Sequence, residues 1–66
     1  MNELTEEQVI DQLADRLVPI YPAIEPHRVS RVVHEEYTRY EGSPIRDYIP
    51  LLVERHAKEE LDKLVA

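Results

Sequence analysis

Three histidines are the side chains best suited to acid–base or metal chemistry in this sequence: His27, His34 and His56. His27 and His34 lie seven residues apart, whereas a metal pair on a helix needs ligands four apart, so we expect both on a solvent-exposed side. His56 precedes Glu59 and Glu60 by three and four residues, which predicts a local histidine–carboxylate pair at the edge of a core. The histidines therefore predict no metal site and no cofactor.

The acidic residues are numerous but do not converge. The 14 Asp and Glu residues are spread along the chain, whereas paired-carboxylate catalysis needs two that meet in a cleft. Glu36 is the exception because it falls on an apolar stripe, where Arg16 or Arg55 from a neighbouring helix would cover it, or a partner would contact it. The absence of cysteine and the single glycine exclude a cysteine nucleophile and a glycine-rich phosphate loop. We predict no catalytic residue and no enzyme.

Three arginines share one flank of an expected helix: Arg28, Arg31 and Arg39. Glu35 lies four residues from Arg31 and four from Arg39, so we expect salt bridges within the helix rather than a basic binding stripe. The whole chain has a net charge of -6 and a pI near 4.9, and such a surface repels phosphate groups. Nucleic acids and anionic membranes are therefore not expected as partners.

The first of the elements that must position these side chains is a helix over residues 6–18. Thr5 stands three residues before Gln8, which is the spacing of a capping box. Leu4 and Val9 are placed to form a hydrophobic staple across this cap. The spacing predicts that the helix begins at residue 6.

A second helix is expected over residues 26–41. Pro26 suits its first position, where the missing N–H costs nothing, and Glu25 would be its N-cap. Gly42 follows as the residue that would end the helix in the left-handed conformation. The tyrosines near the next helix are expected to pack inside, with their hydroxyls reaching solvent or a backbone carbonyl: Tyr37, Tyr40 and Tyr48.

A third helix is expected over residues 44–64, after a very short connection, because Ser43 and Pro44 supply a cap and a first residue. Pro50 would then lie inside this helix, which predicts a kink or break there; the alternative is a helix that restarts with Asp47 as its cap. No stretch alternates as a strand would. The sequence predicts one all-α domain over residues 1–66, an up-down three-helix bundle.

Some apolar residues fall outside the inward stripes. Leu51, Val65 and Ile20 would form a small docking patch on one outer surface. Glu36 and His56 are added to this group because each lies on or beside an inward-facing stripe. The candidate partner-facing residues are therefore Glu36, Leu51, His56 and Val65.

The sequence resembles a small three-helix-bundle domain of actinobacteria. The matching pattern is a valine-rich second helix ending in Glu35-Glu36-Tyr37, followed by Pro-Leu-Leu-Val-Glu-Arg over residues 50–55. That domain occurs alone and at the N-terminus of low-molecular-weight tyrosine-phosphatase-like proteins and arsenate reductases. In those fused proteins a catalytic cysteine belongs to the following domain, and this chain has no cysteine. The resemblance implies the bundle fold and a role as an accessory or interaction module.

The function expected from these observations is that of a small acidic, non-catalytic interaction module. Its partner would be a second copy or a phosphatase-like or arsenate-reductase-like domain. The alternative is a small DNA-binding or transcription-related domain. No apolar run approaches the roughly 20 residues that span a membrane, and the acidic start of the chain is unlike a signal peptide. A cytoplasmic location is therefore expected.

Overall fold

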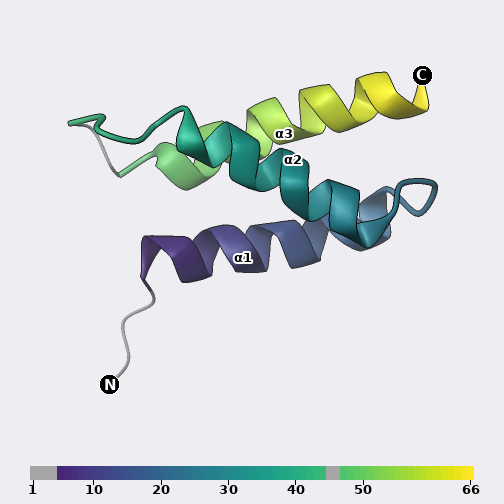
Figure 1. Cartoon of the computed structure of the whole chain (residues 1–66), viewed down its shortest axis with the longest axis horizontal. Coiled ribbons are helices and arrows are strands. Elements are labelled where there is room, and N and C mark those ends of the chain that lie inside the picture. Colours follow the sequence, from purple (N-terminus) through teal and green to yellow (C-terminus); the bar gives the residue numbers. More distant parts are fainter. Residues whose placement is uncertain (1–4, 45–46) are drawn as a thin grey trace.

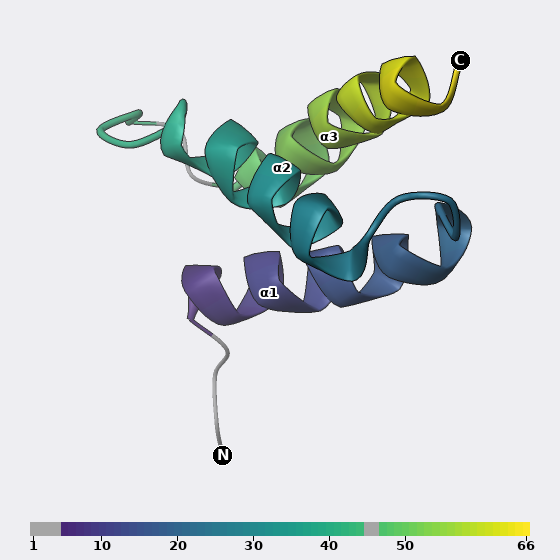
Figure 2. The ribbon, with the colours of Figure 1, turned by 45° about the vertical axis from the view of Figure 1, so that its right-hand side comes forward.

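Three helices, packed side by side, make up the structure. The computed structural model describes residues 5–44 and 47–66. In these residues α1 (Glu6–Leu17), α2 (Pro26–Thr38) and α3 (Ile49–Val65) run up, down and up, with a turn of 3-10 helix, η1 (Val18–Ile20), after α1 (Figure 1). A second view shows α2 lying between α1 and α3 (Figure 2). The predicted all-α three-helix bundle is confirmed.

The start of α1 is held by the predicted capping box. The backbone N–H of Gln8 donates to Thr5 Oγ1 over 3.1 Å, and the N–H of Thr5 donates to Gln8 Oε1 over 2.9 Å. Glu6 and Glu7 occupy the first turn, where negative charge suits the helix dipole. The predicted staple between Leu4 and Val9 lies outside the described residues.

Removing this cap has a measurable expected cost. Thr5→Ala should lower the free energy of unfolding by about 1 kcal/mol, because the backbone N–H of Gln8 loses its acceptor. Urea unfolding followed by circular dichroism measures the change, and Thr5→Ser, which keeps the hydroxyl, is the matched control. Equal stability of all three chains would contradict a stabilising cap.

The start of α2 is Pro26, as predicted, but its end lies three residues earlier than expected, at Thr38. From Arg39 to Glu41 each backbone N–H donates to the carbonyl oxygen three residues back, over 3.0–3.2 Å. This is the hydrogen-bond pattern of 3-10 turns, which replaces that of the α-helix after Thr38. Gly42 follows with φ of 80°, the left-handed conformation expected of it. The N-cap residue Glu25 makes no side-chain hydrogen bond to the helix.

The third helix begins at Ile49 rather than at residue 44, so the predicted short connection and the kink near Pro50 are both wrong. Pro50 lies in the first turn of α3, where no helical partner exists for a backbone N–H, and it therefore disturbs nothing. Tyr48 is the N-cap, one residue after the alternative cap Asp47. The connection between α2 and α3 begins after Thr38 and ends at Tyr48.

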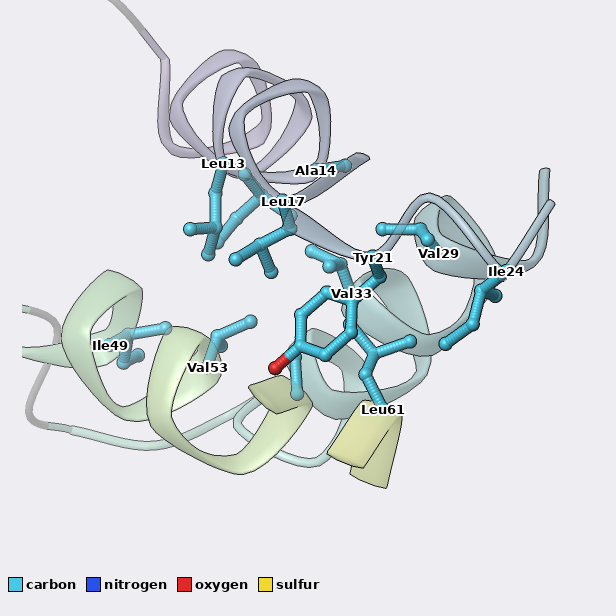
Figure 3. Close-up of a cluster of buried hydrophobic side chains, with 12 residues drawn as sticks. Leu13, Ala14, Leu17, Tyr21, Ile24, Val29, Val33, Ile49, Val53 and Leu61 are labelled. Carbon is cyan, nitrogen blue, oxygen red and sulfur yellow. The ribbon is translucent and has the colours of Figure 1, made fainter. Parts of the chain in front are cut away.

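The core combines one stripe from each helix with two residues of the connection between α1 and α2. On α3 every fourth residue is buried from Ile49 to Leu61. Tyr21 and Ile24, which sequence periodicity did not place inside, are also buried. Figure 3 shows the Tyr21 ring among side chains from all three helices. The full cluster is Ile10, Leu13, Ala14, Leu17, Tyr21, Ile24, Val29, Val33, Ile49, Val53, Ala57 and Leu61.

The tyrosines expected between α2 and α3 are placed differently from one another. Tyr37 and Tyr40 are half-buried and pack against the core. Tyr48 is 63% exposed, so its predicted inside position is wrong. It lies in the turn before α3 rather than within the helix, where the inward stripe begins only at Ile49.

Candidate functional site

Polar contacts tie α1 to α2 along one side of the bundle. The His34 ring lies between Ser30 and Asp11: its Nδ1 is 2.8 Å from the Ser30 carbonyl oxygen, and its Nε2 is 2.8 Å from Asp11 Oδ1. The Tyr37 hydroxyl donates to Glu6 Oε1 over 2.7 Å. His34 is therefore half-buried and held on both sides, not free in solvent as predicted, whereas His27 is exposed.

His56 makes the local pair that its spacing predicts. Its Nδ1 is 3.1 Å from Glu59 Oε1, and its ring stacks on Tyr40 of the segment after α2 with centroids 6.5 Å apart. Glu60 pairs instead with Lys63, over 3.6 Å. These contacts hold the His56 ring against the bundle. Within residues 5–44 and 47–66, no three histidine, aspartate or glutamate side chains gather as metal ligands would.

Tyr21 makes a polar contact that no sequence pattern pointed to. Its hydroxyl donates to Asp62 Oδ1 over 2.7 Å and approaches the Lys58 carbonyl oxygen at 3.4 Å. Burial, the hydrogen bond to Asp62 and the charge of that carboxylate raise the pKa of Tyr21 to about 12. The segment after α1 is thereby tied to the last turns of α3.

A groove runs between α2 and the C-terminal half of α3. Its lining residues are Arg28, Arg31, Val32, Glu35, Glu36, Thr38, Arg39, Glu60 and Leu64. Glu36 is 4% exposed, and its Oε1 atom has no hydrogen-bond partner in the described residues. The predicted cover by Arg16 or Arg55 is wrong, because Glu36 pairs with Arg39, the residue that directly follows α2, at 3.7 Å. This distance is too long for a hydrogen bond, so the buried Oε1 atom has a positive charge nearby but no hydrogen bond, beside an open groove.

The arginines of α2 do not form the predicted salt bridges with Glu35. Arg39 pairs with Glu36 three residues before it, and both Arg28 and Arg31 are exposed. In the described part of the chain neither Arg28 nor Arg31 makes an ion pair. Two positive charges on a protein of net charge -6 are therefore open to other molecules.

Large apolar side chains are exposed mainly on or beside α3. Leu51 and Val65 are 63% and 48% exposed, as expected of candidate partner-facing residues. They lie at opposite ends of α3, about 21 Å apart along the axis at 1.5 Å per residue, so the single patch expected from the sequence is not formed. Leu51 instead lies at the start of α3, as do the exposed Leu52 and the N-cap residue Tyr48. We call Tyr48, Leu51 and Leu52 the α3 entry patch.

In comparisons with known proteins, no family model, curated protein or solved structure matches the chain. Within the described residues, none of the helices has the length and apolar character required to cross a bilayer.

Proposed function

We propose that this protein is a small, non-catalytic interaction module that binds another protein through the α3 entry patch. The observation that carries the proposal is the exposure of Tyr48, Leu51 and Leu52, at 63%, 63% and 37%. Tyr48 is the N-cap of α3, and Leu51 and Leu52 lie in its first turns, so all three belong to the same end of the helix. Side chains of this size gain about 25 cal/mol for each Å² of apolar surface removed from water. A partner that covers the patch would supply that gain.

The arrangement of the titratable groups supports a binding role over a catalytic one. Asp11, Glu6 and Asp62 each accept a hydrogen bond from a ring or hydroxyl of another element. His56 is likewise engaged by Glu59. These groups stabilise the packing of the bundle, whereas a general acid or base needs a free position beside a substrate.

The proposed partner follows from the resemblance to the N-terminal domain of phosphatase-like proteins and arsenate reductases. In those proteins the bundle is joined to the catalytic domain in one chain. We propose that this chain docks on such a domain as a separate protein in the cytoplasm. Its own surface would then act as an accessory to chemistry carried out by the cysteine of the partner.

Titration calorimetry with a purified low-molecular-weight tyrosine-phosphatase-like domain tests this proposal. Leu51→Asp should weaken binding at least about tenfold, because a carboxylate would be buried at the interface. Ile20→Asp, at a 56% exposed apolar residue of η1, is the matched control and should bind as the unchanged protein does. Failure of the unchanged protein to bind would reject this class of partner. Equal binding by Leu51→Asp would reject the α3 entry patch.

The alternative function, DNA binding, is supported by the exposed Arg28 and Arg31, which have no ion pair within the described residues. The net charge of -6 opposes it, because phosphate would be repelled at long range. A mobility-shift assay at low salt distinguishes the two functions. A shift that depends on DNA sequence would overturn the preference for a protein partner.

A further inference from the structure

A row of alternating charges runs along α2 and its two cap residues, on the side that borders the groove. It consists of Glu25, Arg28, Val32, Glu35 and Arg39, which we call the α2 seam. Successive members are three or four residues apart, so all of them lie within about a quarter of a turn of one another. Read along the chain, their charges are negative, positive, neutral, negative and positive. This surface is separate from the α3 entry patch.

The α2 seam is complementary to itself when reversed. Glu25 and Arg39 are each seven residues from Val32, on opposite sides. Arg28 lies four residues before Val32, and Glu35 lies three after it. A second α2 laid antiparallel across Val32 would therefore bring opposite charges together at each of these positions. In a parallel arrangement each charge would instead face its own copy, which costs energy.

The groove beside the α2 seam gives a second, independent reason for such a contact. The Oε1 atom of Glu36 is buried without a hydrogen-bond donor, and a buried unsatisfied group of this kind costs free energy. Glu36 lies four residues after Val32, and Arg28 lies four residues before it. A second α2 that runs antiparallel would therefore place its Arg28 beside Glu36 of the first chain. Within the described part of one chain, Arg28 has no ion pair. Glu36 Oε1 has an ion pair with Arg39 but no hydrogen bond, and Arg28 of the second chain would donate the hydrogen bond that it lacks.

We infer that the chain forms a twofold-symmetric dimer in which two α2 seams pack antiparallel, with Val32 at the symmetry axis. Each charged contact then occurs twice, as an isologous interface requires. Leu64, which is 44% exposed at the edge of the groove, would be covered together with the half-buried Val32. The dimer would place both α3 entry patches outside the interface.

Sedimentation velocity from about 10 μM to about 1 mM tests the dimer, because the population of a dimer depends on concentration. We expect a mass approaching twice the 7.8 kDa of one chain. Arg28→Glu and Glu35→Arg should each raise the dissociation constant at least about tenfold, since each variant alone places like charges opposite one another. Both residues are exposed, so folding should persist, and circular dichroism checks it.

Mixing the two variants gives the decisive result. The reversed charge of Arg28→Glu then faces the reversed charge of Glu35→Arg, so the mixture should dimerise more tightly than either variant alone. Arg55→Glu, a charge reversal at an exposed residue of α3, and Leu51→Asp should both leave the dimer intact. A monomer at all concentrations, a dimer insensitive to Arg28→Glu, or a mixture that stays monomeric would each overturn the inference. Because Leu51→Asp affects only the proposed function, the two proposals can fail separately.

Discussion

Leu61→Ala should leave most of the protein unfolded near 37 °C. Leu61 is fully buried on α3, where it packs with side chains from the other helices. Truncation of a buried leucine costs about 2–5 kcal/mol, because the transfer energy is lost and a cavity is left. A domain of this size has about 3–5 kcal/mol of stability in total. Thermal unfolding followed at 222 nm measures the loss.

The same substitution at Leu51 is the matched control. Leu51 lies on the same helix but is 63% exposed, so Leu51→Ala should change the free energy of unfolding by about 0.5 kcal/mol or less. Similar melting temperatures for the two variants would show that the cluster around Leu61 is not the one that stabilises the protein.

Stability should fall as the pH rises from about 10 to about 12, and Tyr21 is the residue responsible. The unfolded chain releases the Tyr21 proton near its ordinary pKa of 10.0, whereas the folded chain holds it until about 12. Between these values the unfolded state binds fewer protons, so raising the pH favours unfolding. After allowance for solvent screening near the exposed Asp62, we expect a loss of about 1–2 kcal/mol.

Urea unfolding at a series of alkaline pH values measures this loss. Tyr21→Phe removes the ionisable group and should flatten the decline, whereas Tyr48→Phe, at a 63% exposed tyrosine, should not. Tyr21→Phe should also cost about 1 kcal/mol at neutral pH, because Asp62 loses a donor. A decline of the same steepness in both variants would rule out Tyr21 as its source.

The start of a helix can be predicted from the sequence where a single local signal marks it. The capping box at Thr5 and the proline at position 26 both begin helices as predicted. Before α3, two signals compete, because Pro44 and Pro50 cannot both occupy a first turn. A cap at Ser43 is worth about 1 kcal/mol, but a proline inside a helix costs about 3 kcal/mol. The helix begins at Ile49 because the cost of an internal proline exceeds the gain from the cap.

The contacts between helices could not be predicted in the same way. Periodicity identifies which side of a helix faces inward, but it does not give the position of one helix along the axis of the next. Tyr21 and Asp62 are 41 residues apart, and Asp11 and His34 are 23 apart. The place of Glu36 on an apolar stripe marks it as unusual in the sequence alone. Its missing hydrogen bond depends on the positions of its neighbours in space.

The contact between Tyr21 and Asp62 also bears on the handedness of the bundle. Leucines and valines such as Leu17 and Val33 pack well whether a third helix lies on one side of the first two or on the mirror-image side. The Tyr21 hydroxyl follows directly after η1 and reaches Asp62 when α3 is on the observed side. On the other side it would lose that acceptor, at a cost of about 1–3 kcal/mol if it stayed buried. One hydroxyl group thus favours one of the two handednesses in which the three helices could be arranged.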